Sequence, residues 1–398
     1  MKKILLTTFT VLLLGTLVWI FFFRGTSAPI IDTLRDGLPF GSGEGVDLPI
    51  SNNSDSTIGE KTNFDINANE QKIFRIANTP TAGFVAFTRG TSTIVRYMDR
   101  ATGHISETNL KTSGVAKITN QTIPKIYEAY FKKDGGAVVI RTIEGTDQIS
   151  NSVITLTPPK NITNDALYTI TSTKLRGDMD SLLVGSGDTL SYVLRDVPSI
   201  VSSTFTGTGL KTLISSPIKN WRLFKLGNNT AIYTKATASV SGYAYSLTGS
   251  SLNKILGPLN GLTVIGNSLG DMALYSYTDT VGTKLAVKNI KTGDSSDILP
   301  VSLAEKCVWS TKKPYIFYCG TPTEGVSAYE PDNWYLGKTH FTDNLWHFDM
   351  QAELAQLVME PDVEFGLDLD ISDPQLSPNE DYLIFINKRD LTLWAVKL

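Results

Sequence analysis

The chain has 398 residues, and its 36 Lys and Arg residues nearly balance its 39 Asp and Glu residues, which gives a pI of about 5.7. Such a balance provides no basic surface for a phosphate backbone, so nucleic acid is not an expected partner. Only 19% of the residues are charged, and Ser, Thr, Gly and Asn are plentiful while helix-forming runs of Leu, Ala, Glu and Lys are absent. This composition predicts an all-β protein.

The N-terminus carries an apolar run from Ile4 to Phe23, preceded by Lys2 and Lys3 and closed by Arg24. A helix of this length spans about 30 Å, the thickness of a bilayer core, whereas the apolar part of a secretory signal has about 7–15 residues. We therefore expect residues 1–24 to form an uncleaved transmembrane anchor, with a cleaved signal as the alternative. The two lysines predict a cytoplasmic N-terminus, which places the rest of the chain outside the cytoplasm at the cell membrane.

Residues 25–62 are dense in Gly, Ser, Pro and Asp. A segment of this composition buries too little apolar surface to offset the entropy lost on ordering, so it is expected to be a flexible linker. Residues 63–398 are expected to form the folded domain.

Strand-like clusters recur throughout this domain. The first group is expected to contain Ile73–Ile76, Phe84–Thr88, Ile94–Asp99 and His104–Leu110. The second strands of successive groups begin about fifty residues apart, close to the length of a β-propeller blade, and this spacing gives seven groups. Six or eight blades stay open because the periodicity is poor between Asp165 and Pro217.

The last stretch of the chain, Asp373 to Leu398, reads as three short strands separated by turns. Its pattern S-P-N-x-x-x-L-x-F, from Ser377 to Phe385, followed by L-W-x-V-x-L, resembles the WD-like repeat of TolB and its relatives. The resemblance implies a β-propeller. The fragments Ile94–Gly103 and Leu285–Asp294 carry it more weakly.

The final blade lacks one strand, because its third strand ends the polypeptide. A strand from Phe64–Asn67 or Lys72–Ile76 is expected to complete it and close the ring. TolB-like proteins have an α/β domain ahead of the propeller, whereas this chain has the apolar run and the polar linker there. The partners of TolB are therefore not predicted for this chain.

Cys307 and Cys319 are the two cysteines of the chain, and a turn near Lys313 sets them opposite each other on paired strands. A disulfide is expected in an exported domain, with free buried thiols as the alternative; a metal site needs more ligands. The acidic stretch Asp362–Asp373 lacks the glycine and the distal glutamate of a calcium loop, and is expected to be a solvated crossing between blades. No metal or cofactor is predicted.

One long insertion, Thr321–Thr342, interrupts the sixth group. Its aromatic and polar residues Tyr329, Asp332, Trp334 and Tyr335 form a candidate recognition loop, because such a mixture is enriched at binding surfaces and binding residues often lie on loops held by a rigid scaffold. The alternative is a loop that folds back over the domain as a structural lid.

These features predict a membrane-anchored, monomeric propeller that binds a protein or glycan partner of the cell envelope or beyond it. The alternative is a hydrolase or lyase that cleaves a glycan or other polymer in the central funnel. That chemistry requires paired carboxylates or a metal cluster that converge from several blades. No such set repeats at a fixed blade position, so no catalytic residue is predicted.

Overall fold

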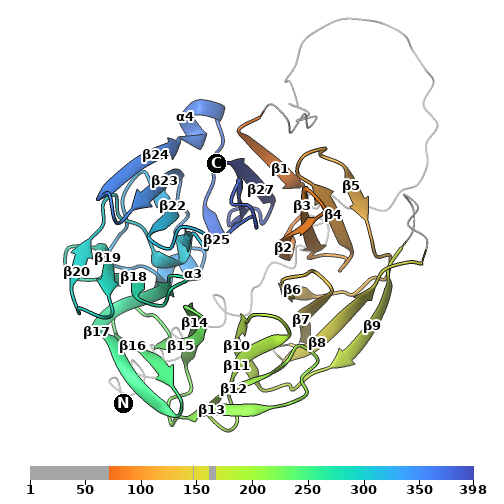
Figure 1. Cartoon of the computed structure of the whole chain (residues 1–398), viewed down its shortest axis with the longest axis horizontal. Coiled ribbons are helices and arrows are strands. Elements are labelled where there is room, and N and C mark those ends of the chain that lie inside the picture. The colour runs from red at the N-terminus through yellow and green to blue at the C-terminus, as the bar shows by residue number, and fades with distance from the viewer. Residues whose placement is uncertain (1–70, 147, 161–166) are drawn as a thin grey trace, which may run out of the picture. The chain divides into compact units, whose positions relative to one another are not determined.

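The computed structural model describes residues 71–146, 148–160 and 167–398, and nearly all regular structure in them is β-strand. Figure 1 shows these strands as sheets arranged around a ring. The predicted anchor and linker lie outside the described residues. Within the described part of the chain, no helix is long and apolar enough to cross a membrane.

The first three sheets each contain four antiparallel strands in sequence order. They are β2 (Thr81–Arg89), β3 (Ser92–Asp99), β4 (Ile105–Asn109) and β5 (Val115–Lys117); β6 (Ile126–Phe131), β7 (Ala137–Glu144), β8 (Gln148–Thr157) and β9 (Thr169–Lys174); and β10 (Met179–Val184), β11 (Thr189–Leu194), β12 (Ser199–Thr204) and β13 (Lys211–Ser215). The middle strands are buried on both faces, whereas β5 is exposed throughout. Each sheet thus packs against a neighbour on both sides and turns its last strand to solvent.

The next sheet has seven strands. They are β14 (Trp221–Leu226), β15 (Asn229–Thr234), β16 (Ser241–Thr248), β17 (Ser251–Gly266), β18 (Met272–Thr278), β19 (Thr283–Asn289) and β20 (Ser295–Asp297). The long β17 pairs with β16 through its first part and with β18 through its second part. It bends at Gly257, whose φ of 105° favours glycine and where a Cβ would lie 2.4 Å from the carbonyl oxygen of Gly242. The sheet is therefore two four-stranded units that share β17.

Two four-stranded sheets complete the ring. One contains β21 (Cys307–Trp309), β22 (Ile316–Pro322), β23 (Asp343–Asp349) and β24 (Leu354–Met359), with the short helices η1 (Ala304–Lys306), α3 (Asp332–Tyr335) and α4 (Pro361–Phe365) around it. The other contains β25 (Ile371–Leu376), β26 (Tyr382–Asn387), β27 (Leu393–Lys397) and β1 (Ile73–Ala77).

Strand β1 closes the ring by pairing with β27 (Figure 1). The prediction that a strand from Lys72–Ile76 completes the last sheet is therefore confirmed. The same pairing shows that the assignment of Ile73–Ile76 to the first group is wrong. The first sheet obtains its fourth strand from β5 instead.

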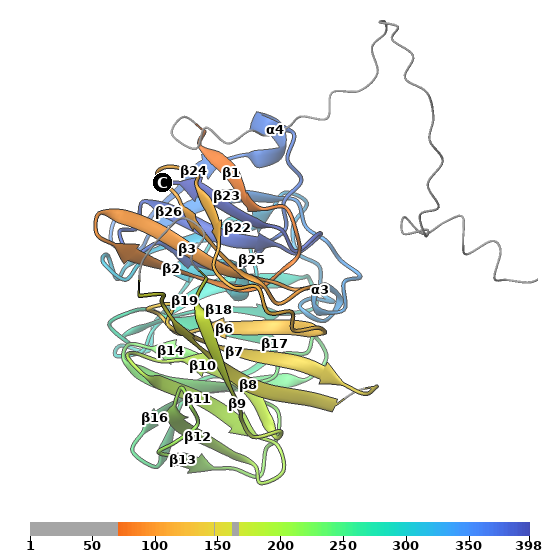
Figure 2. The ribbon, with the colours of Figure 1, turned by 90° about the vertical axis from the view of Figure 1, so that its right-hand side faces the viewer.

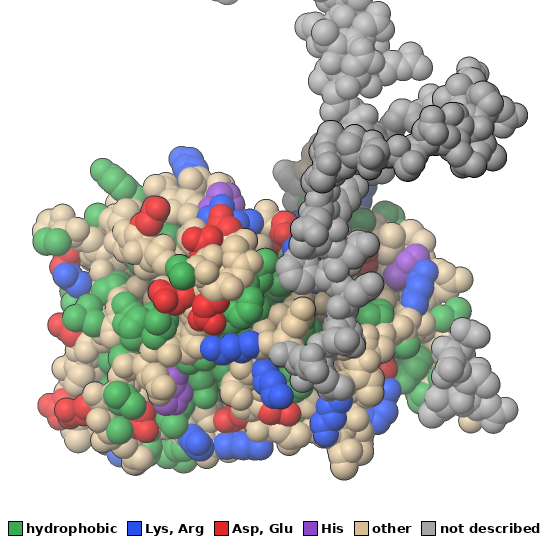
Figure 3. Space-filling model, turned by 90° about the horizontal axis from the view of Figure 1, so that it is seen from above, with side chains coloured by type: hydrophobic (Ala, Val, Ile, Leu, Met, Phe, Trp, Pro, Cys, Tyr) green, Lys and Arg blue, Asp and Glu red, His purple; other side chains and the backbone are tan. Residues whose placement is uncertain are grey.

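Apolar clusters join every sheet to the next one around the ring. Phe74 and Ile384 of the last sheet pack with Phe84 and Val95 of the first, so the circle is continuous. Equivalent clusters lie between each other pair of neighbours, including the two halves of the seven-stranded sheet. This arrangement is a β-propeller. On the side seen in Figure 3, acidic and basic side chains are interspersed with apolar ones.

Candidate functional site

A cavity of about 720 Å³ opens at the end of the ring where the insertion lies, and we call it the insertion-end cavity. Its walls come from β6, β7, β10, β14, the loop after β15, η1 and α3, so several sheets converge on it. Figure 2 shows α3 at one end of the ring. The charged residues of the lining are Glu128, Arg141, Arg222, Lys235, Glu305 and Asp332. The insertion, to which Asp332 belongs, also contributes Tyr335 and Leu336.

The structure separates the four residues of the predicted recognition loop. The side chain of Tyr329 is 71% exposed and that of Tyr335 is 38% exposed. Trp334 is only 5% exposed, so it cannot offer its ring to a partner and instead holds the insertion against the domain. A carboxylate oxygen of Asp332 accepts a hydrogen bond from the backbone N–H of Ala238 at 2.9 Å. The insertion therefore combines a buried anchor with an exposed outer part.

The buried anchor of the insertion lies on a sealed ionic cluster of Lys306, Asp343 and Asp370. All three side chains are fully buried. The Lys306 ammonium donates to Asp343 at 2.8 Å, to Asp370, and to the carbonyl of Ile371 at 3.0 Å. The indole N–H of Trp334 donates to the Asp370 carboxylate at 3.0 Å. The tryptophan thus covers the cluster and supplies one of the bonds that hold it.

The cluster has two carboxylates for one ammonium group. Burial raises the pKa of Asp343 to about 6, since the attraction of Lys306 offsets only part of the desolvation and Asp370 adds repulsion. Among the described residues, one oxygen of Asp343 has no hydrogen-bond partner. A proton on this carboxyl therefore relieves a buried negative charge.

Asp370 corrects the expectation for the acidic stretch Asp362–Asp373. Asp362, Glu364 and Asp368 are exposed, as a solvated crossing requires, but Asp370 is fully buried. The sequence gives no local signal for this difference, because Lys306 is 64 residues away.

A second link ties the insertion to the cavity wall through Glu305 of η1. Its two carboxylate oxygens accept hydrogen bonds from the hydroxyls of Tyr233, at 2.8 Å, and Tyr335, at 2.6 Å. Burial, aided by the charge of Glu305, raises the pKa of both hydroxyls well above the ordinary value. The tyrosines therefore remain protonated donors at physiological pH.

The other carboxylates of the insertion-end cavity are also bound by protein groups. Glu128 accepts from Arg141 at 2.8 Å, and Asp332 is held by the backbone as described above. These hydrogen bonds fix the carboxylates in the cavity wall.

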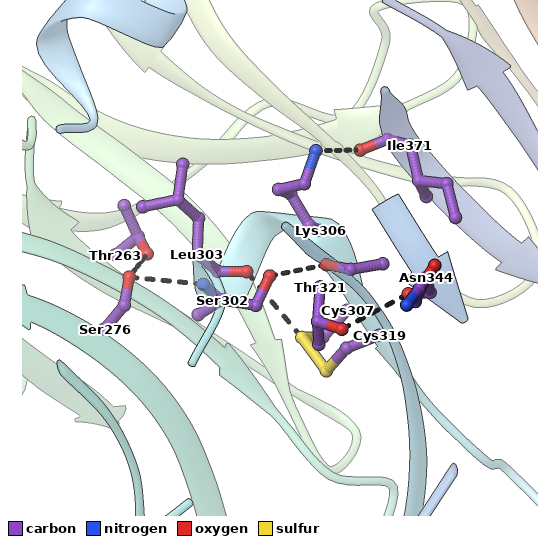
Figure 4. Close-up of a disulfide and its surroundings, with 12 residues drawn as sticks. Thr263, Ser276, Ser302, Leu303, Lys306, Cys307, Cys319, Thr321, Asn344 and Ile371 are labelled. Carbon is purple, nitrogen blue, oxygen red and sulfur yellow. Dashed lines mark hydrogen bonds between the residues drawn. A yellow bond between two sulfur atoms is a disulfide. The ribbon is translucent and has the colours of Figure 1, made fainter. Parts of the chain in front are cut away.

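Cys307 and Cys319 face each other on β21 and β22, and a disulfide joins them with their Cα atoms 4.1 Å apart. Figure 4 shows the bond next to Lys306, whose amino group donates to Ile371. The disulfide therefore fixes the strand pair that directly follows the buried lysine. Among the described residues, no three or more His, Cys, Asp or Glu side chains form a group suited to a metal ion.

Solved structures similar to this chain are β-propellers. YCF48, determined with a bound D1 peptide, is 9% identical, with 82% of this chain and 96% of its own covered at a TM-score of 0.53. The GH74 xyloglucanase from Xanthomonas campestris is 12% identical, with 81% of this chain and 53% of its own covered at a TM-score of 0.51. TolB from Acinetobacter baumannii is 11% identical, with 67% and 63% covered at a TM-score of 0.41.

No protein-family model and no curated protein matches the sequence. Identities of this size show the fold alone. The propeller fold is thus supported by similarity to solved structures as well as by the strand topology, whereas membership of the TolB family is not shown.

Proposed function

We propose that this chain is a membrane-anchored, extracytoplasmic binding module whose partner, a protein or glycan of the envelope or beyond it, docks over the insertion-end cavity. The observation that supports the proposal is that exposed side chains of the insertion lie at the edge of the cavity, while the carboxylates of the cavity are hydrogen-bonded within the protein. Tyr335 and Leu336 of the insertion are 38% and 67% exposed there, while the carboxylates of Glu128, Glu305 and Asp332 are engaged by protein donors. Exposed aromatic and apolar groups on a fixed scaffold suit recognition.

The same proposal includes the number of blades, the membrane anchor and the linker. Counting β17 in both halves of its sheet gives a seven-bladed propeller, with the anchor at residues 1–24 and the linker at residues 25–62.

The proposal of an anchor is based on the apolar run from Ile4 to Phe23. Carbonate-washed membranes are expected to retain the full-length protein, and external protease is expected to remove the propeller; a soluble chain starting near Pro29 would contradict the anchor.

The binding surface is tested by placing a photo-cross-linking amino acid at Leu336 in the full-length protein in its native membranes. A matched control carries the same group at Val197, which is 69% exposed in the turn between β11 and β12. A discrete adduct is expected from position 336 and not from position 197. Equal adducts from both positions, or none from either, would contradict the proposal.

The enzyme alternative is tested separately. Both the xyloglucanase and YCF48 are similar only in fold, so neither comparison decides between cleavage and binding. Release of new reducing ends from a glycan, abolished by Glu128→Gln or Glu305→Gln, would replace the binding module with a hydrolase or lyase.

A further inference from the structure

A second cavity, of about 820 Å³, lies at the opposite end of the inner strands. The two ends of strand β15 lie at different cavities. Asn228, just before the strand, lines the second cavity, and Lys235, just after it, lines the insertion-end cavity. We call the second one the turn-end cavity, because the turns that join the first two strands of successive units border it. Its inner part reaches Trp334 and shares Leu223, Tyr233 and Glu305 with the insertion-end cavity, whereas its outer part is formed by the turns and does not include Tyr335 or Leu336.

Two lysines line the turn-end cavity without an acidic partner. Lys133 lies in the turn between β6 and β7, and Lys225 lies on β14. Lys225 donates to the hydroxyl of Ser186 at 3.4 Å, and within the described part of the chain no ion pair joins either lysine to a carboxylate. Burial and then the neighbouring ammonium of Lys133 lower the pKa of Lys225 to about 8. The two cations therefore repel each other, and among the described residues neither has a carboxylate in ion-pair contact.

Neutral groups around the two lysines are mostly hydrogen-bond donors. Ser186, Asn228 and Ser268 come from three successive turns and line the same cavity. Two carboxylates also line the cavity, and neither forms an ion pair with Lys133 or Lys225 among the described residues: Glu305 accepts hydrogen bonds from two tyrosines, and Asp373 accepts one from the side-chain amide of Gln375 at 3.5 Å. A negative group between the lysines would gain two charge-assisted hydrogen bonds and relieve their repulsion.

We infer that the turn-end cavity is a binding site for a small ligand bearing an oxyanion, a phosphate or carboxylate group, held between Lys133 and Lys225. Lysine suits this role because its ammonium is a point charge with three donors that can turn toward any oxygen. The hydroxyl and amide groups of the neighbouring turns then contact the remaining oxygens of the ligand.

The test is calorimetric titration of the full-length protein in neutral detergent with inorganic phosphate and, in a second arm, citrate. Sodium chloride keeps the ionic strength constant, because screening alone weakens any charge contact. Lys133→Ala and Lys225→Ala are each expected to weaken binding about tenfold, the size of one charge-assisted hydrogen bond. Lys225→Arg should retain most of the affinity. Binding of phosphate only, or of citrate only, identifies the group that the site prefers.

The matched control is Lys235→Ala, which removes a cation from the insertion-end cavity and should leave the titration unchanged. A second readout is acylation of lysines at pH 8 followed by mass spectrometry, in which phosphate or citrate should protect Lys225. No heat and no protection with either anion would overturn the inference, as would an equal loss of affinity in Lys235→Ala. A failed cross-link at Leu336 would leave this result unaffected, so the two proposals fail separately.

Discussion

Two groups of charged side chains in this propeller differ in their burial and in the sign of the charges next to them. The sealed cluster of Lys306, Asp343 and Asp370 is fully buried, and each charge has a partner of opposite sign. Lys133 and Lys225 have the same sign and face an open cavity. Water screens the open pair, whereas the sealed cluster depends wholly on its own geometry. The sealed charges are therefore expected to govern stability, and the open ones to govern binding.

The largest expected effect comes from removing the charge at the centre of the sealed cluster. Lys306→Met leaves two carboxylates buried without their cation, so the free energy of unfolding should fall by about 3–5 kcal/mol. Chemical denaturation measures this loss. The matched change Lys225→Met, in the open pair, should alter stability by no more than about 0.5 kcal/mol. Similar losses in the two variants would end the distinction between them.

A slightly smaller effect is expected when the cover of the cluster is removed. Trp334→Ala deletes a buried ring and the indole donor to Asp370, so the free energy of unfolding should fall by about 3–4 kcal/mol. Tyr329→Ala changes an exposed ring in the same insertion and should leave the melting temperature nearly unchanged. If Trp334→Ala is as mild as Tyr329→Ala, the insertion is not anchored as described.

The smallest of the three effects appears as pH dependence. The pKa of Asp343 is raised to about 6 in the folded protein, so between about pH 4 and pH 6 the folded state binds more protons than the unfolded state. Stability from this group is complete below that window and is lost as the pH rises through it, by up to about 3 kcal/mol. Asp343→Asn should flatten the profile, and Asp362→Asn, in an exposed carboxylate, should not. Parallel profiles for all three proteins would show that Asp343 titrates normally.

The positions of the strands could be predicted well from local sequence patterns, whereas the pairing between strands could be predicted less well. Tyr382–Asn387 is a strand with the predicted bounds, because its alternating apolar residues are buried on both faces. Ile73–Ala77 is also a strand, but it pairs with the end of the chain rather than with its neighbours in sequence. Val115–Lys117 was missed because it is short and exposed, so no hydrophobic periodicity marks it.

The sealed cluster could not be predicted in the same way. Lys306 directly follows Glu305 and Asp370 belongs to the acidic stretch Asp362–Asp373, so nothing distinguishes them or Asp343 in the sequence from charged residues that are solvated, as most are. They meet because η1, β23 and the segment before β25 converge under the insertion, which is a property of the ring. The prediction for Trp334 came from the mixture of aromatic and polar residues in the insertion, and its role as a buried cover required the three-dimensional arrangement.

The pairing of β1 with β27 also determines how the propeller responds to mechanical force. Among the described strands, β1 is the edge strand of its sheet, and β27 is its only neighbour within that sheet. A pull on the chain ahead of Ile73 is therefore expected to load the side-chain contacts of Lys72 with Val358 and Glu364 and the backbone hydrogen bonds between these two strands. If they part, β27 becomes an open edge while the pairings within the other sheets remain. We therefore expect this strand pair to separate first when the propeller is under tension.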